Sequence, residues 1–419
     1  MKSIWGRVLA FSAVLAIFAG ALQAAAAEGG ETPPPTPVPP RGSPSPFPTS
    51  LATPSDATRE PTVTPAAALL ADLDTGQLLF SKNASTPRPI ASVTKVMTAL
   101  ISLDALPLHD VVHVDPRAVF GRNRFGATSR LGLHAGEPIT VENLLYALLL
   151  GSANDAAVEL AIAVAGSEPA FVQEMNAQAR QLGMGRTRFY SSSGLDDRGR
   201  STPRDLFRLV RAVDANAVFT SITETRFRRI PAPRGPDRVI QNRNALLWLY
   251  PGSFGTKTGA TAAAGACLVA SAEREGRRLV AIVLDDAHEP FSSAAALLEY
   301  GFEGWQEQVL VQDGQPEGTV GIRGGTVPVS AGASLRALVR MHGGGVTSDV
   351  IVDPSAAFPP ATGASVGWLV LHSGTDPLGR VPLVVPSVPP APARSGPWWA
   401  RSAASIAASL AAAVRSLGA

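Results

Sequence analysis

Blocks of hydrophobic residues in the first three quarters of the chain have the lengths of strands at the two ends and of helices between them. An apolar run at 67–73, turn residues at 74–76 and a second apolar run at 77–80 predict a β-hairpin. Farther along, apolar residues around a turn at 273–276 predict two more strands, at 264–272 and 278–284. Helical patterns predict helices at 91–103, 141–150, 156–165, 168–182 and 297–300. This order predicts a mixed α/β domain, residues 65–304, whose sheet is largely antiparallel.

After residue 304 the pattern changes to short apolar segments that are punctuated by Gly and Pro. Six such segments predict strands, at 318–322, 326–329, 335–341, 349–352, 365–371 and 381–385. Residues 305–386 are therefore predicted to form a small all-β domain.

The start of the chain has the organisation of an exported protein. Lys2 and Arg7 precede an apolar stretch at 8–22 and a small-residue tract at 24–27, so residues 1–27 predict a signal peptide. An uncleaved membrane anchor is the alternative, and with either the functional part lies outside the cytoplasm. The segment 28–64 is rich in Pro, Thr and Ser and buries too little apolar surface to fold, which predicts a disordered linker.

The end of the chain predicts an attachment to a membrane surface. A second Pro-rich linker, 387–397, precedes an alanine-rich helix predicted at 398–419, with apolar residues on one face and Arg and Ser on the other. Only about a dozen residues separate Arg401 from Arg415, too few to span a bilayer. We therefore predict that this amphipathic helix lies in the interface at the outer face of the cytoplasmic membrane. A helix packed on its own protein is the alternative.

Composition narrows the functional classes. The 419 residues carry a net charge of +2 with the basic residues scattered, which gives no support to a nucleic-acid-binding surface. The single cysteine, Cys267, excludes an intrachain disulfide, and its apolar surroundings predict a buried thiol in a strand. The six histidines show no paired spacing, so the sequence contains no His-rich zinc motif.

The first candidate for chemistry is Ser92-Val93-Thr94-Lys95, at the start of a predicted helix. On a helix, positions i and i+3 share a face, so the lysine amine can reach the serine hydroxyl. A serine hydroxyl needs a nearby base to act as a nucleophile, and a lysine serves as that base only if burial or positive charge lowers its pKa. Alone, this pair is a weak signal, because many solvated helices contain it by chance.

The second candidate, Ser152-Ala153-Asn154, fills the polar break between two predicted helices. Ser152 can relay a proton to a leaving amine, and Asn154 can hold Lys95 and the substrate backbone. By itself the motif is equally a helix N-cap, with Ser152 or Asn154 satisfying free amides.

The third candidate is Lys257-Thr258-Gly259, on a predicted strand edge. Lys257 and Thr258 can bind a substrate carboxylate, and Gly259 lets the substrate backbone approach closely. The amide of Ala260 can form an oxyanion hole together with the amide of Ser92.

Ser-x-x-Lys, Ser-x-Asn and Lys-Thr-Gly in this order form the motif set of penicillin-binding proteins and class A β-lactamases. Around these motifs the chain resembles the low-molecular-mass penicillin-binding proteins that are D-alanyl-D-alanine carboxypeptidases. The likeness runs over 67–385 and rests on the stretches 91–99, 148–165, 175–176, 182–184, 255–259, 264–265, 363–367 and 382–384. It implies a β-lactamase/transpeptidase-like α/β domain with a mainly antiparallel sheet, followed by the small β domain and a terminal amphipathic anchor.

The resemblance also implies a mechanism. Ser92 attacks the carbonyl between the last two D-alanines of a peptidoglycan pentapeptide with Lys95 as base, D-alanine leaves, and water hydrolyses the acyl-enzyme. Penicillins and other β-lactams acylate Ser92 in the same way but are released slowly. The resemblance implies neither a metal nor an organic cofactor.

Two stretches depart from the pattern of the family. Residues 289–292, Glu-Pro-Phe-Ser, stand where many relatives have an arginine that helps bind the substrate carboxylate. Lys257 and Thr258 are therefore expected to bind the carboxylate alone. Residues 191–195, Ser-Ser-Ser-Gly-Leu, stand where relatives read Asn-Pro-x-Gly-Leu.

Three alternative functions share these motifs. A class A β-lactamase needs a glutamate-held water, and no matching glutamate loop is evident between Ser152 and Lys257. A DD-endopeptidase, which cuts cross-links, has the same nucleophile and base. A non-catalytic wall-binding or β-lactam-sensing module would have no need of both Ser92 and Lys95.

Overall fold

The computed structural model describes residues 51, 56, 58–119, 129–287, 289–342, 345–374 and 376–386. The predicted signal peptide, the second linker and the C-terminal helix lie outside these residues, as does most of the first linker. Within the described ranges, no helix combines the length and the hydrophobicity needed to cross a membrane.

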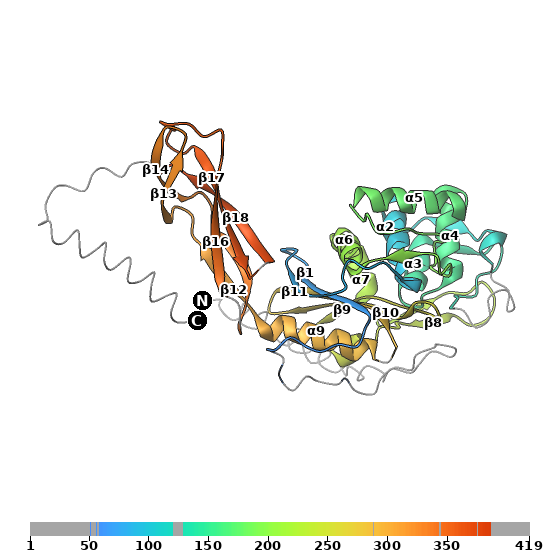
Figure 1. Cartoon of the computed structure of the whole chain (residues 1–419). Helices are drawn as coiled ribbons and strands as arrows, with labels where there is room; N and C mark the ends of the chain where they lie inside the picture. The colour runs from blue at the N-terminus through green and yellow to red at the C-terminus, as the bar shows by residue number, and fades with distance from the viewer. Residues whose placement is uncertain are drawn as a thin grey trace, which may run out of the picture. The chain divides into compact units, whose positions relative to one another are not determined.

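A five-stranded sheet with the order β2-β1-β11-β10-β9, antiparallel throughout, forms the centre of the first domain (Figure 1). The strands come from both ends of the domain, because β1 pairs with β11, the last strand of the domain. The predicted α/β fold with a mainly antiparallel sheet is therefore confirmed. The strands are β1 (Ala67–Asp72), β2 (Leu78–Lys82), β9 (Ser253–Thr261), β10 (Gly265–Arg274) and β11 (Arg277–Asp286).

The two strands predicted at 264–272 and 278–284 are confirmed as β10 and β11, and the third motif lies on a strand, β9, as predicted. The hydrophobic pattern alone did not give the bounds of β9, because Lys257, Thr258 and Gly259 show no alternation of apolar and polar side chains. β10 and β11 follow the predicted segments closely, and Cys267 in β10 is buried as predicted.

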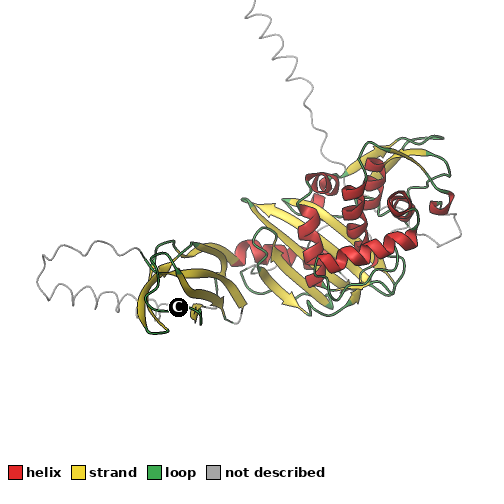
Figure 2. Ribbon diagram, turned by 90° about the horizontal axis from the view of Figure 1, so that it is seen from above, coloured by secondary structure: helices red, strands yellow, loops and turns green. Residues whose placement is uncertain are grey.

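Helices cover both faces of the sheet (Figures 1 and 2). Side chains alternate between faces along a strand, so Leu69 of β1 packs with the larger group of helices and Leu70 packs with α9. Burial on both faces explains why 67–71 is an unbroken apolar run. The helices are α2 (Lys95–Ala105), α3 (Val141–Leu149), α4 (Asn154–Ala165), α5 (Glu168–Gln181), α6 (Pro203–Asp214), α7 (Ala217–Glu224), α8 (Leu246–Leu249) and α9 (Pro290–Gly304).

Short elements complete the domain. They are the 3-10 helices η1 (Ala91–Thr94) and η2 (Pro116–Ala118) and three two-stranded pairs: β3 (Arg88–Pro89) with β6 (Arg200–Ser201), β4 (Val111–His113) with β5 (Pro138–Thr140), and β7 (Phe227–Ile230) with β8 (Arg238–Gln241). The predicted helix 91–103 thus begins with a 3-10 turn, and α4 begins two residues earlier than predicted.

The end of the predicted first linker belongs to the packed domain. Val63 is buried in the cluster that includes α9, and Thr64 donates a hydrogen bond to the carboxylate of Asp286 at 3.0 Å. A single valine in a Pro- and Thr-rich context carries no periodicity, so the sequence pattern could not locate this contact.

The region after α9 is built from strands, as predicted. β12 and β15 pair with each other, and the remaining strands form a second sheet with the order β13-β14-β18-β17-β16. β12 was not predicted, because four of its seven residues are exposed and mostly polar. The strands are β12 (Trp305–Val311), β13 (Pro316–Ile322), β14 (Gly325–Ala331), β15 (Leu335–Arg340), β16 (Val346–Val352), β17 (Ser365–Ser373) and β18 (Asp376–Val384).

Candidate active site

The nucleophile predicted from the first motif lies in the turn that starts α2. Ser92 is part of η1, and the preceding Ala91 has a left-handed backbone with a φ of 45°. Lys95 is the first residue of α2, and its Nζ lies 2.9 Å from Ser92 Oγ. The i, i+3 spacing therefore brings the two side chains into hydrogen-bonding contact, as predicted.

Two further groups hold the Lys95 amine in place. Asn154 Oδ1 accepts a hydrogen bond from Lys95 Nζ at 2.7 Å, and the carbonyl oxygen of Ser193 accepts one at 2.6 Å. A neutral amine has two hydrogens and one lone pair. It can donate to these two oxygens, which carry no hydrogen of their own, and accept the hydrogen of Ser92 Oγ. The contacts of Lys95 are therefore all satisfied by its unprotonated form.

Burial favours that form. Lys95 is completely buried, and its pKa falls from 10.5 to about 7, first because burial penalises the charge and second because of the nearby Arg243 guanidinium. Asp155 and Glu168 act in the opposite direction but do not compensate. A lysine with this pKa is available as a base near neutral pH.

The second motif lies directly beside the first. Ser152 follows α3 with a left-handed φ of 57°, and Asn154 starts α4. The N-cap of α4 is Ala153, which makes no side-chain capping bond, so the interpretation of the motif as a helix cap is wrong. The amide group of Asn154 instead faces Lys95.

The lysine of the third motif contacts the serine of the second. Lys257 is buried, and its Nζ lies 3.0 Å from Ser152 Oγ and 2.8 Å from the carbonyl oxygen of Thr258. Its pKa is well below the usual value, because of burial and then because of the positive charges of Lys95 and Arg243. Thr258 and Gly259 are partly exposed and Ala260 is exposed, so this end of β9 borders solvent.

β9 passes close to the backbone of the nucleophile. A Cβ atom on Gly259 would lie 3.0 Å from the amide nitrogen of Ser92, a distance that a side chain could not adopt without moving its neighbours. The absence of a side chain therefore lets the third motif approach the Ser92 amide, which together with the Ala260 amide is the predicted oxyanion hole.

The unusual stretch 191–195 keeps its position through contacts that the sequence did not reveal. Glu168 Oε1 accepts hydrogen bonds from the amide of Ser192 at 2.9 Å and from its hydroxyl at 2.7 Å. The hydroxyl of Thr98 donates to the carbonyl oxygen of Ser192 at 2.6 Å. These bonds position the next carbonyl, that of Ser193, on Lys95.

Arg243 is a further residue that sequence reasoning missed. Its amide donates to the carbonyl oxygen of Leu150, just before the second motif, and its guanidinium lowers the pKa of both Lys95 and Lys257. The side chain is partly exposed and makes no hydrogen bond or ion pair with any residue that the structure describes. The polar run at 241–244, which begins at the last residue of β8 and precedes α8, was the available signal.

The site thus gathers three basic side chains. The two nearby carboxylates do not pair with them, because Glu168 binds Ser192 and Asp155 accepts backbone amides of 131–133. Among the described residues, no group of three or more His, Cys, Asp or Glu side chains is arranged to hold a metal ion. The arrangement provides a nucleophile, a base and an excess of positive charge.

Known proteins are similar to this chain in sequence and in fold. A family model described as D-alanyl-D-alanine carboxypeptidase matches residues 54–288. D-alanyl-D-alanine carboxypeptidase DacB2 of Mycobacterium tuberculosis is 38% identical over 242 residues, which cover 56% of this chain and 81% of the relative. A D-alanyl-D-alanine endopeptidase of Escherichia coli is 34% identical over 230 residues, which cover 54% and 73%.

The fold agrees with the same family. The crystal structure of penicillin binding protein 6B from Escherichia coli superimposes with a TM-score of 0.61 at 27% identity and covers 80% of this chain and 99% of that protein. Because the family model spans more than half of the 419 residues, the chain belongs to the D-alanyl-D-alanine carboxypeptidase family and is a serine-type hydrolase of the penicillin-binding proteins.

Proposed function

We propose that this enzyme removes the terminal D-alanine from peptidoglycan pentapeptides through an acyl-enzyme on Ser92, with Lys95 as the general base. One observation carries this assignment: the buried amine of Lys95 lies 2.9 Å from Ser92 Oγ and has a pKa of about 7. The family acts on peptidoglycan stem peptides outside the cytoplasm and binds β-lactams.

In the first step, Lys95 takes the hydroxyl proton as Ser92 Oγ bonds to the carbonyl carbon of the penultimate D-alanine. The oxyanion that forms accepts hydrogen bonds from the amides of Ser92 and Ala260. The proton then passes through Ser152 to the leaving amine as the C–N bond breaks, with Lys257 holding Ser152 Oγ at 3.0 Å. Water, deprotonated by the same base, hydrolyses the ester and restores Ser92.

The free carboxylate of the substrate is bound by Thr258 and Arg243. Lys257 is buried, and its amine already donates hydrogen bonds to Ser152 Oγ and to the carbonyl oxygen of Thr258. Arg243 is partly exposed and without a side-chain hydrogen bond among the described residues. A guanidinium is suited to bind a carboxylate through two parallel bonds. Arg243 thereby replaces the arginine that relatives have near 289–292.

Endopeptidase activity on cross-linked peptides is the second candidate function. The observation that favours it is the 34% identity to a relative that is named an endopeptidase. A β-lactamase is less well supported, because Glu168, the glutamate between the second and third motifs that acts on the pKa of Lys95, accepts two hydrogen bonds from Ser192.

The test is D-alanine release from a pentapeptide ending in D-Ala-D-Ala, compared between the wild type and Ser92→Ala. Release by the wild type and none by the variant supports the proposal. A folded wild type that binds a fluorescent penicillin covalently but releases no D-alanine refutes the carboxypeptidase assignment. Cross-linked dimeric peptides in the same assay then decide whether the enzyme is an endopeptidase.

Attachment to the outer face of the cytoplasmic membrane through 398–419 remains a proposal that rests on the amphipathic pattern of that segment. Membrane fractionation of the full chain and of a chain ending at residue 397 tests it. Equal recovery of both chains in the soluble fraction would refute it.

A further inference from the structure

A second surface pocket, separate from the active site, lies on the side of α6. It has a volume of about 350 Å³, within the range of small-molecule sites. Three arginines form its wall and two apolar side chains form part of its floor. The lining residues are Gly76, Leu78, Arg204, Phe207, Arg208 and Arg211.

The arginines converge because of their spacing along the helix. Positions 204, 208 and 211 are four and three residues apart, which places the side chains on one face of α6. The opposite face carries Leu206, Leu209 and Val213, all buried in the core, so the arginine face is directed to the surface. Phe207 lies between the arginines, with the Arg211 guanidinium 5.9 Å from its ring centre.

Much of the hydrogen-bonding capacity of these arginines is unused. The Arg204 side chain is exposed and makes no hydrogen bond or ion pair with any residue that the structure describes. Arg208 uses one nitrogen, Nη1, to bind the buried carboxylate of Asp205 at 2.7 Å. Arg211 donates from Nε and Nη2 to the carbonyl oxygens of Leu73 and Asp74, and its Nη1 makes no hydrogen bond with any residue that the structure describes.

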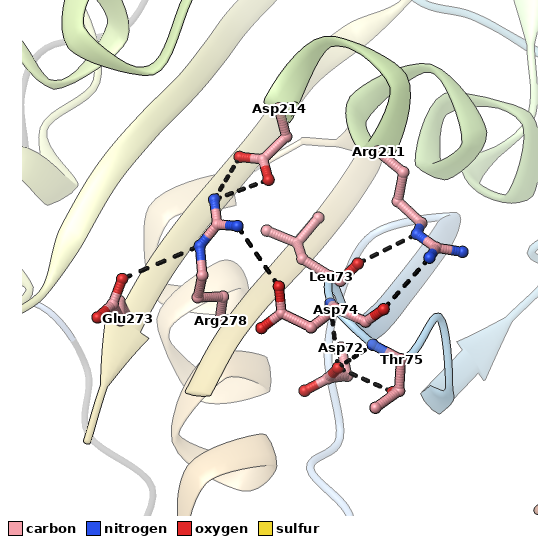
Figure 3. Close-up of polar contacts among 8 residues, drawn as sticks. All are labelled: Asp72, Leu73, Asp74, Thr75, Arg211, Asp214, Glu273 and Arg278. Carbon is pink, nitrogen blue, oxygen red and sulfur yellow. Dashed lines mark hydrogen bonds and ion pairs between the residues drawn. The ribbon is translucent and has the colours of Figure 1, made fainter. Parts of the chain in front are cut away.

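The backbone contacts of Arg211 fix the pocket wall against the turn between β1 and β2 (Figure 3). The acidic side chains of Asp214, Asp74 and Glu273 in the same view pair with Arg278, at 2.6, 3.5 and 3.9 Å. The pocket lining itself carries three guanidinium groups and no carboxylate. Within the described part of the chain, the carboxylate that forms an ion pair with a lining arginine is that of Asp205, with Arg208.

The pocket is well separated from Ser92. On β10, the residue level with Thr258 is Leu268, and the residue level with Asp72 at the turn beside the pocket is Ala272, through Leu279 of β11. These two levels are four residues apart, which is about 13 Å along the strand direction. Three strand spacings between β9 and β1 add a lateral distance of about 14 Å. A ligand in the pocket would not overlap a peptide at the active site.

We infer that this pocket binds a phosphomonoester whose organic part has an apolar surface. A phosphomonoester carries a charge of about −2 at neutral pH, opposite in sign to the three lining arginines, and offers three oxygens to several guanidinium donors. Its organic part packs on Phe207 and Leu78. Such a group occurs both in lipids with a terminal phosphate and in soluble sugar or glycerol phosphates, which share this chemistry.

The experiment uses the full chain and calorimetric titration with phenyl phosphate and with inorganic phosphate at low salt. The wild type is expected to bind phenyl phosphate more tightly than inorganic phosphate, because only the former has an apolar part. Arg204→Gln/Arg208→Gln is expected to weaken binding at least ten-fold. The control, Arg229→Gln/Arg234→Gln, removes two exposed positive charges from the β7–β8 hairpin and is expected to change affinity less than two-fold.

Vesicles of phosphatidylcholine with and without phosphatidic acid distinguish the two sources. If the protein sediments only with vesicles that contain phosphatidic acid, and Arg204→Gln/Arg208→Gln does not sediment with them, the ligand is a lipid. If the wild type binds phenyl phosphate but does not sediment with these vesicles, the ligand is a soluble phosphomonoester. If the double variant misfolds, Arg204→Gln alone tests the site, since this side chain supports no other described residue. Absence of phenyl phosphate binding to the wild type, or equal weakening in the α6 and control variants, would overturn the inference.

Discussion

The pKa of Lys95 makes a quantitative prediction for the pH dependence of acylation. If the unprotonated amine is the base, the second-order rate constant for acylation of Ser92 by a penicillin rises with pH and levels off above about 7, the pKa of Lys95. Below pH 6 the rate constant should fall about ten-fold for each pH unit, because the fraction of unprotonated amine falls by that factor.

The size of the rate effect follows from the lowered pKa of Lys95. At pH 7 a lysine with the usual pKa of 10.5 is unprotonated in about one molecule in three thousand, whereas Lys95 is unprotonated in about half. Burial therefore increases the concentration of active base about a thousand-fold or more. Without this shift, the rise in rate would be centred more than three pH units higher.

Two variants should move the pH profile in opposite directions. Arg243→Gln removes a positive charge that disfavours the ammonium form of Lys95, so the midpoint moves to higher pH. Glu168→Gln removes a negative charge that favours the ammonium form and keeps an oxygen for Ser192, so the midpoint moves to lower pH. Each displacement should be about half to one pH unit, as expected for charges at moderate distance.

The assay is covalent labelling by a fluorescent penicillin between pH 5 and 9, with circular dichroism at each pH to confirm that the protein is folded. If Arg243 binds the carboxylate of the penicillin, the Arg243→Gln variant should also be labelled more slowly at high pH, where the rate has levelled off. Full rate at pH 5 would refute the role of Lys95 as base. Displacement of both variants in the same direction would refute the electrostatic origin of the shift.

Three further predictions concern stability and reactivity. Gly194→Ala should lower the free energy of unfolding by about 3 kcal/mol or more in denaturant titration, because its Cβ would lie 1.9 Å from the carbonyl oxygen of Ala91. Gly185→Ala, where nothing lies within 4 Å, is the control, and equal stabilities of the two variants would contradict the reasoning. Burial raises the pKa of the Cys267 thiol to about 12, so a thiol reagent at pH 8 should react only after denaturation; rapid reaction of the native protein would contradict this. Asp286→Asn should cost about 2 kcal/mol, measured by the same titration, because the buried carboxylate accepts hydrogen bonds from two hydroxyls and one amide; an unchanged midpoint would refute this.

The sequence was most informative where identity and spacing act together. Ser92 and Lys95 are three residues apart on one helix turn, so their contact follows from helix geometry alone. The strands β1 and β2 follow from the sequence because each begins with an apolar run and the turn residues 74–76 separate the two runs. For these elements, the local sequence is sufficient to predict the contacts that the folded chain makes.

The remaining parts of the site depend on contacts between distant segments. The carbonyl oxygen of Ser193 holds Lys95, but a backbone carbonyl leaves no signature in a sequence. Arg243 affects Lys95 from a segment almost 150 residues away, and only the folded chain brings the two together. Lys257 was predicted to meet a carboxylate directly, whereas its burial and its bond to Ser152 emerge only when β9 lies beside the loop between α3 and α4.

The close approach of β9 to the turn of Ser92 also limits how this enzyme can escape its inhibitors. Gly259 leaves no space between the strand and the Ser92 amide, and Gly194 lies against the carbonyl of Ala91. A substitution at either glycine moves the amide that receives the oxyanion, and a β-lactam and a peptide need that amide in the same place. Mutations here that abolish drug binding must also abolish cell-wall hydrolysis. Resistant variants should therefore arise at the exposed rim of the site, where drug and peptide differ in shape.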